Sequence, residues 1–278
     1  MKPPLKPWNL STDLTPRPGT FNMAVDEHLF RQTGRDSRTF VRFYRWERPT
    51  VSLGYSQRVD AVVDVDSCRR HGVDIVRRIT GGKLVLHWRE ITYAVASSDT
   101  EIFSDSLQES YRRISSGLIL GLEKMGLRAR LAGPPPSSYS KGNMPCFAYP
   151  ARDEIELDGR KIVGSAQKRI GGRFLQHGSI PLRGDDGLLD RISLCRQAAP
   201  GLQMISLCEA LGREIDAQWA VERLRDGLAE YFQVRFEPLV LGRNDEDAVR
   251  RVQEKRYADE AWTMGRSEAA GIDFIDFG

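Results

Sequence analysis

Residues 77–95 read RRITGGKLVLHWREITYAV, and this stretch decides the fold of the chain. Residues 83–88 and 91–98 are rich in β-branched and aromatic side chains, which favour strands. Residues 73–79 have the same character, and a glycine pair follows them. The pattern predicts three successive strands, of which the first two are joined through residues 80–82, with a plain hairpin turn as the simplest interpretation of the glycine pair.

Strand and helix patterns alternate on both sides of this stretch. Helix patterns, with apolar residues at intervals of three and four, cover residues 21–31, 60–71 and 106–125. Thr20 is the candidate N-cap of the first helix, and Ser106 with Glu109 reads as the capping box of the third. Further strand patterns cover residues 39–46 and 50–55. Such alternation is typical of a mixed α/β domain.

A three-stranded meander follows a proline-rich segment at residues 133–143. Its strands are residues 153–157, 160–170 and 173–182. Asp158-Gly159 and Gly171-Gly172 stand between them, and such pairs are strong hairpin signals. From about residue 204 the pattern is mainly helical, with one strand-like interruption at residues 234–241.

Composition limits the function classes. The 278 residues carry a net charge of only +3, which argues against a nucleic-acid reader but suits a surface that meets acidic protein partners. No apolar run has the length of a signal peptide or membrane span, so we expect a cytoplasmic protein that does not bind membranes. The four cysteines have no C-x-x-C spacing, so free thiols are expected and a metal site is not.

Cys146 and Lys161 form the first candidate catalytic pair. Cys146 stands in MPCFAYP (residues 144–150), directly after the proline-rich segment, and Lys161 opens the middle strand of the meander. Taken singly, the cysteine fits a buried core position and the lysine a packed stem with a solvated amine. Taken together they fit a nucleophile, because a nearby ammonium favours the thiolate.

The glycine pair and two histidines form a second constellation. Gly81 and Gly82 would let the backbone approach a ligand, next to the positive charges of Arg77, Arg78 and Lys83. The pattern is neither a Walker A loop nor a dinucleotide-binding motif. His87 and His177 each stand alone within a strand, where a hydrogen-bonded structural role is the simpler interpretation and no third group completes a triad.

The same residues carry a resemblance to a known superfamily. Residues 77–95 resemble the RR-x-TGG-x-x-x-LH-x-x-E-x-TY signature of the biotin/lipoate protein ligase superfamily, and residues 159–182 resemble its RK-x-x-GSAQ-x-R and LQHGS segment. Residues 19–30 (GTFNMAVDEHLF), 51–57 (VSLGYSQ) and 255–262 (KRYADEAW) resemble further motifs. The similarity covers residues 19 to 265.

The resemblance implies a fold and a division of the chain. The fold is a mixed α+β domain of the biotin ligase and class II aminoacyl-tRNA synthetase type, with a central mixed sheet flanked by helices. Residues 1–200 would form the acyltransferase core. Residues 201–278 would form a mainly helical part packed on the same domain.

Within the superfamily, a cysteine about 15 residues before the GRK lysine is similar to the octanoyltransferases. This implies Cys146 as acyl acceptor and Lys161 as its activating partner. The acyl site would be lined by Arg78, Gly81, Gly82, His87, Gly164, Ser165, His177 and Gly178. Lys83, Leu84 and Ala94 depart from the residues expected at their positions, which bears on acyl-chain preference.

The implied reaction transfers octanoyl from octanoyl-acyl carrier protein to a lysine of a lipoyl domain, in the glycine cleavage H protein or a dehydrogenase E2 subunit. Exchange of one thioester for another is nearly neutral and amide formation is downhill, so no ATP and no cofactor are expected. N–H groups near Gly164 and Ser165 would support the oxyanion.

Three alternatives stay open. One is an ATP-dependent lipoate ligase, although Trp88-Arg89-Glu90 stands where such ligases carry an aspartate-glycine-asparagine pattern. A second is an amidotransferase that moves octanoyl between two lipoyl domains. The third is a lipoyl-domain binding protein without activity.

Overall fold

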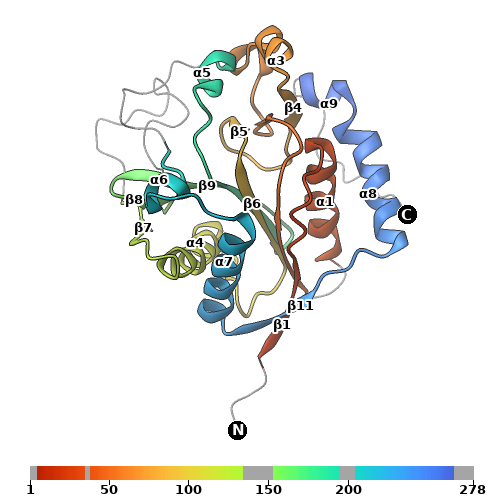
Figure 1. Ribbon diagram of the computed structural model, residues 1–278. Helices are drawn as coiled ribbons and strands as arrows, with labels where there is room; N and C mark the ends of the chain where they lie inside the picture. Colours follow the sequence, from red (N-terminus) through yellow and green to blue (C-terminus); the bar gives the residue numbers. More distant parts are fainter. Residues whose placement is uncertain (1–4, 35–37, 134–152, 195–203, 266–278) are drawn as a thin grey trace.

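The computed structural model describes residues 5–34, 38–133, 153–194 and 204–265. Strands and helices alternate along most of this chain (Figure 1). The strands are β1 (Lys6–Ser11), β2 (Thr39–Tyr44), β3 (Thr50–Leu53), β4 (Asp74–Arg77), β5 (Val85–His87), β6 (Glu90–Ser97), β7 (Arg130–Leu131), β8 (Ile155–Leu157), β9 (Arg160–Ile170), β10 (Arg173–Pro181) and β11 (Val234–Pro238). The α-helices are α1 (Gly19–Gln32), α2 (Val59–Val62), α3 (Val65–His71), α4 (Leu107–Glu123), α5 (Leu188–Ile192), α6 (Leu207–Leu211), α7 (Ala217–Phe232), α8 (Arg243–Val252) and α9 (Glu260–Met264), with a π-helical turn, η1 (Gln253–Tyr257), directly after α8.

A large mixed sheet forms the centre of the molecule. Within the described residues it has eight strands in the order β11-β1-β2-β6-β10-β9-β8-β7. β1 pairs in parallel with both β11 and β2, and the remaining neighbours are antiparallel. This arrangement confirms the predicted central mixed sheet. It also shows that the chain after residue 204 supplies an edge strand, β11, to the same sheet.

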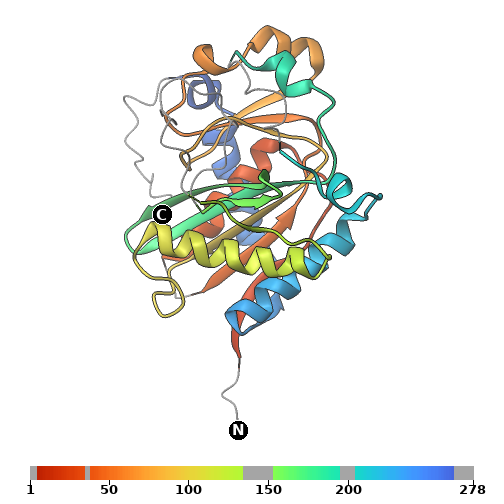
Figure 2. The ribbon, with the colours of Figure 1, turned by 90° about the vertical axis from the view of Figure 1, so that its left-hand side faces the viewer.

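Helices cover both faces of the main sheet. α4 and α7 pack on one face, and α1 and α8 pack on the other (Figures 1 and 2). β2 shows how the sequence sets this up, since Val41 and Phe43 face the α4 and α7 layer while Phe40 and Tyr44 face α1. Successive residues of a strand point to opposite faces, so in a sheet covered on both sides apolar residues occur on both faces, and a buried polar residue such as Arg42 needs a partner.

α4 and α7 touch through glycines. A Cβ atom placed on Gly227 would lie 2.2 Å from the backbone nitrogen of Gly121 and 2.7 Å from the carbonyl oxygen of Gly117. Two helix backbones can approach this closely only where side chains are absent. The contact joins the region after residue 204 to the sheet layer built from the middle of the chain.

A second sheet corrects one interpretation of the sequence. It has the order β4-β3-β5, with β3 parallel to β4 and antiparallel to β5. β4 and β5 are therefore not neighbours, and the prediction of a hairpin turn at Gly81-Gly82 is wrong. β3, which comes earlier in the chain, occupies the place between them, so residues 80–82 cross over one end of this sheet.

The meander is confirmed. β8, β9 and β10 are joined by tight turns in which Asp158, Gly159, Gly171 and Gly172 all have positive φ, at 51°, 78°, 56° and 76°. Two consecutive positive φ angles match the twist of the flanking strands, and Asp-Gly and Gly-Gly supply them at little cost.

Several boundaries differ from the predictions. The helix expected at residues 60–71 is two helices, because Val63 is extended and forms a β-bridge with Ser193, while Asp64 caps the nitrogen of Ser67. The first helix is capped at Pro18 rather than Thr20. Ser106 does cap α4, accepting from the backbone N–H of Glu109. The short helix α5 lies outside the predicted elements.

Among the described residues, no helix combines the length and apolar character needed to cross a bilayer.

Candidate active site

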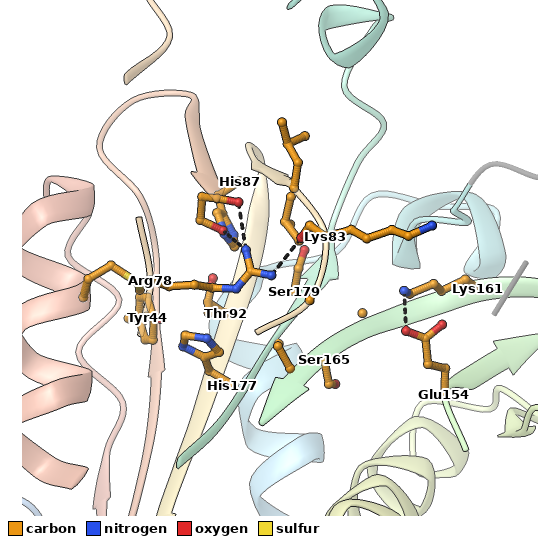
Figure 3. A pocket seen from close by; sticks show the side chains of 18 residues that line it. Tyr44, Arg78, Lys83, His87, Thr92, Glu154, Lys161, Ser165, His177 and Ser179 are labelled. Carbon is orange, nitrogen blue, oxygen red and sulfur yellow. Dashed lines mark hydrogen bonds and ion pairs between the residues drawn. The ribbon is translucent and has the colours of Figure 1, made fainter. Parts of the chain in front are cut away.

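A cavity of about 280 Å³ lies between the small sheet and the neighbouring strands β9 and β10 (Figure 3). The residues that surround it are Met23, Tyr44, Ser52, Arg78, Gly82, Lys83, Leu84, Val85, His87, Thr92, Glu154, Lys161, Gly164, Ser165, Ala166, His177, Gly178 and Ser179. Its size falls at the lower end of the range typical of small-molecule sites. Figure 3 shows Lys161 and Glu154 at one end of the group and Tyr44 and Arg78 at the other.

Most of the candidate site residues meet in this cavity. Those that line it are Arg78, Gly82, His87, Lys161, Gly164, Ser165, His177 and Gly178. Gly81 does not line it, but its carbonyl oxygen accepts a hydrogen bond from Arg78. Cys146 lies outside the described residues. The strands that bring these groups together are distant in sequence, so the grouping is a product of the tertiary fold.

Arg78 holds the crossover segment in place. Its side chain is buried, and burial lowers its pKa to about 10. Its nitrogens donate to the hydroxyl of Thr80 and to the hydroxyl and carbonyl oxygens of Ser52. They also donate to the carbonyl oxygens of Gly81 and Lys83, at 2.9 and 2.7 Å. These five contacts match the five N–H donors of a guanidinium, so Arg78 shapes the segment beside the cavity.

His177 lies in the first of two carboxylate-histidine-hydroxyl chains. Its Nδ1 is 2.9 Å from Asp26 Oδ2, and its Nε2 is 2.7 Å from Thr80 Oγ1. The carboxylate accepts, so Nδ1 carries the proton and Nε2 accepts from the hydroxyl, which in turn accepts from Arg78. Burial lowers the pKa of His177, and Asp26 opposes the shift only in part.

His87 lies in the second chain. Its Nδ1 is 2.7 Å from Glu90 Oε1, and its Nε2 is 2.7 Å from Ser52 Oγ, which also accepts from Arg78. Glu90 further accepts from the hydroxyls of Thr92 and Ser179. The expectation that no third group completes a triad is wrong in its geometry, because Asp26 on α1 completes the chain of His177, and Glu90, three residues after His87 at the start of β6, completes the other. The hydrogen-bonded structural role expected for both rings is what the geometry shows.

Asp26 accepts hydrogen bonds from three side chains. It accepts from Arg42 at 2.7 Å and from the hydroxyl of Tyr44 at 2.9 Å, as well as from His177. Burial alone would raise the pKa of Asp26, but the charge of Arg42 and these hydrogen bonds hold it below its usual range. A buried carboxylate paired in this way fixes the ring of His177 against the cavity.

Lys161 has a partner that the sequence interpretation missed. Its Nζ lies 2.6 Å from Glu154 Oε1, and both side chains are about one-tenth exposed and line the cavity. Glu154 directly precedes β8, and no sequence motif marks it as a site residue. Its position in an acidic stretch just before the GRK turn is the one signal that could have indicated it.

The glycines of β9 and β10 let the two strands and Lys161 pack closely. A Cβ atom on Gly178 would lie 2.6 Å from the carbonyl oxygen of Gly164, from Ser165 Oγ and from a ring carbon of Tyr93. One on Gly164 would lie 3.0 Å from Lys161 Cε. Ser165 Oγ is 2.7 Å from the hydroxyl of Tyr93, whose pKa burial raises to about 12.

The cavity suits an apolar chain that ends in a reactive group. The polar side-chain atoms of Arg78, His87 and His177 form hydrogen bonds within the protein, so these residues add few unpaired polar atoms to the walls. Met23, Leu84, Val85 and Ala166 add apolar surface. The charged pair of Lys161 and Glu154 stands at one end (Figure 3).

Of the three departures noted in the sequence, two face the cavity. Lys83 and Leu84 line it, whereas Ala94 is buried in the layer between the main sheet and α1. Of the three departures, Ala94 is therefore the one that is not placed to contact a molecule in the cavity.

Comparisons with known proteins agree with this geometry. Residues 18–229 match the model of the lipoyl protein ligase A/B catalytic domain. The chain is 35% identical over 270 residues to the octanoyltransferase LipM of Symbiobacterium thermophilum, covering 92% of this chain and 98% of that protein. It is 37% identical over 254 residues to LipM of Kyrpidia tusciae, covering 86% of this chain and 93% of that protein.

Solved structures share the fold. A crystal structure of lipoate-protein ligase A bound with ATP superposes with a TM-score of 0.78 at 22% identity, covering 95% of this chain and 99% of that chain. The bipartite lipoate protein ligase of Thermoplasma acidophilum gives a TM-score of 0.75 at 22% identity, covering 94% and 97%. At these identities the likeness concerns the fold alone. By its sequence match and its fold, the chain belongs to the lipoyl protein ligase A/B catalytic domain family.

Proposed function

We propose that this protein is an octanoyltransferase of lipoate biosynthesis, which transfers an octanoyl group to a lysine of a lipoyl domain through a thioester on Cys146. The similarity to relatives named octanoyltransferase LipM over nearly their whole length carries the proposal. The cavity supports it, since it offers apolar walls and a lysine at one end. The proposed acyl donor is octanoyl-acyl carrier protein, and the proposed acceptors are the glycine cleavage H protein and dehydrogenase E2 subunits.

In the first step the thiolate of Cys146 attacks the donor thioester. The ammonium of Lys161 would stabilise that thiolate. The carrier's thiol leaves with the proton that Cys146 gave up, so one thioester replaces another and no ATP is consumed. Covalent catalysis of this kind lets two protein substrates be used in turn.

Backbone N–H groups near Gly164 and Ser165 are the proposed donors to the tetrahedral oxyanion. β8 pairs with β9 only as far as Val163, so beyond that point β9 has a described strand partner, β10, on one side only. The N–H groups of this segment that point away from β10 are the proposed donors. Each such donor is typically worth roughly 3 to 4 kcal/mol of transition-state stabilisation.

Intact-mass measurement tests the proposal. Wild-type protein incubated with octanoyl-carrier protein should gain the mass of one octanoyl group, and hydroxylamine should remove it. Cys146→Ala should remain folded and gain nothing. Cys208→Ala, which removes a half-exposed thiol of α6, should be acylated like the wild type.

Other outcomes would point to the alternatives. Pyrophosphate release from ATP with free octanoate would indicate a ligase. Acylation by an octanoylated lipoyl domain, but not by the carrier protein, would indicate an amidotransferase. Binding to a lipoyl domain with no adduct and no turnover would indicate a binding protein, and the absence of an adduct on Cys146 would refute the transferase.

A further inference from the structure

The ion pair of Lys161 and Glu154 raises a question of proton balance. The acceptor lysine attacks the thioester as an amine, and its nitrogen must release a proton when the C–N bond forms. A protonated lysine cannot accept that proton, because its nitrogen has no lone pair. Glu154 offers a carboxylate that lines the same cavity, 2.6 Å from Lys161 Nζ.

The backbone around Glu154 is built to present this carboxylate. The preceding residue, Asp153, has a φ of 70°, in the left-handed region that few residues other than glycine adopt. Its side chain accepts from Gln108 at 2.8 Å and from Arg112 at 3.3 Å, both on α4. The backbone of Glu154 is fixed as well, since its carbonyl oxygen accepts from the N–H of Ala132 at 2.7 Å.

The side chain of the next acidic residue, Glu156, does not line the cavity. Glu156 lies two positions further along β8, where alternation would place its side chain on the same face. The pairing of β8 with β9 shifts register between Ile155 and Glu156. The carboxylate of Glu156 accepts from Arg130 at 2.7 Å instead, and Glu156 does not line the cavity.

We infer that Glu154 is the proton acceptor for the attacking amine, an assignment that rests on the proposed transferase function. The C–N bond forms, and the C–S bond breaks with its electron pair leaving on the cysteine sulfur as a thiolate. One proton passes from the nitrogen to Glu154. Release of that proton to solvent restores the carboxylate and its 2.6 Å contact with Lys161, so no co-reactant is needed.

Separate measurement of the two half-reactions tests this role. The enzyme is first acylated with octanoyl-carrier protein and then mixed with unmodified H protein, and each step is followed by intact mass. Glu154→Gln keeps a hydrogen-bonding side chain beside Lys161 but removes the base. It should transfer the acyl group to H protein roughly 100-fold more slowly, and this step should be slowed far more than formation of the acyl-enzyme.

Glu156→Gln is the matched control, because it removes a similarly buried carboxylate two residues away, in β8. It should carry out both steps at the wild-type rate. A chemical rescue distinguishes a proton acceptor from a merely structural group. In Glu154→Ala, added acetate should accelerate acyl transfer, whereas chloride at the same ionic strength should not.

The outcomes separate the two proposals. If Glu154→Gln transfers at the wild-type rate, or if acetate fails to accelerate Glu154→Ala, the role of Glu154 is refuted while the transferase function stands. If the wild type itself forms no acyl-enzyme, the proposed function fails first.

Discussion

The guanidinium of Arg78 donates a hydrogen bond to the backbone carbonyl oxygen of Lys83 over 2.7 Å. The same group reaches Ser52 and Thr80, whose hydroxyls bond to His87 and His177. One buried cation therefore joins the crossover segment to both histidine chains. The wall of the cavity therefore depends on the hydrogen bonds of Arg78, which itself lines the cavity.

Arg78→Lys should lose both stability and activity. A lysine has three donors on one nitrogen and cannot reach acceptors spread across a planar fork, so buried carbonyl and hydroxyl groups would lose their partners. We expect the free energy of unfolding to fall by roughly 3 kcal/mol, measured by urea denaturation. Arg69→Lys, at an exposed ion pair on α3, should change it by less than about 0.5 kcal/mol. Equal effects of the two substitutions would contradict the role of Arg78.

Stability should fall as the solution is acidified below about pH 6.5, the ordinary pKa of histidine. Burial holds the pKa of His177 below that value in the folded state. The unfolded chain therefore binds a proton on this residue more readily than the folded protein, and stability rises with pH through this range. Urea denaturation at a series of pH values should show a shallower slope for His177→Gln than for the wild type. An unchanged slope would exclude His177 as a source of the dependence.

Gly178→Ala should disrupt the contact between β9 and β10. The added methyl group would lie 2.6 Å from a carbonyl oxygen of the neighbouring strand, and backbone in the middle of a sheet cannot move cheaply. We expect a loss of roughly 3 kcal/mol in the free energy of unfolding, together with weaker acylation. Gly184→Ala is the control, since a Cβ there meets no atom within 4 Å. Thermal denaturation of both variants gives the comparison.

Cys68 should resist alkylation in the folded protein. It is buried in the small sheet's core, and burial, with a smaller contribution from Asp64, raises the pKa of its thiol to about 11. At pH 8 little thiolate is present and reagent has little access. Iodoacetamide followed by mass spectrometry should label Cys208 in the native protein and Cys68 only after unfolding. Rapid native labelling of Cys68 would contradict its placement.

Local signals were enough to predict most of the elements. β9 and β10 have tight turns that only glycine and aspartate tolerate well, so their ends could be predicted within a residue or two. α4 has a clear apolar stripe and a serine cap. The helix at residues 60–71 was predicted as one piece because the bridge between Val63 and Ser193 joins segments far apart in the chain.

The residues of the candidate site were likewise predicted only in part. The motifs pointed to Arg78, His87, Lys161 and His177, since each stands in a recognisable strand or turn. They did not reveal which of these groups bind protein and which are available to a substrate. Glu154 was missed because it precedes the strand and no motif includes it, and because the register shift that leaves Glu156 outside the cavity has no sequence signature.

The sequence by itself determined the alternation of strands and helices, the meander with its two turns, and the family, because these depend on periodicity and on residues fixed at short range. The tertiary structure alone decided that β3 separates β4 from β5, that Asp26 orients His177, and that Glu154 lies against Lys161. Such contacts join residues distant in sequence, or they depend on one local distortion of the backbone. Their energy comes from burial and hydrogen bonding that exist only once the layers have packed.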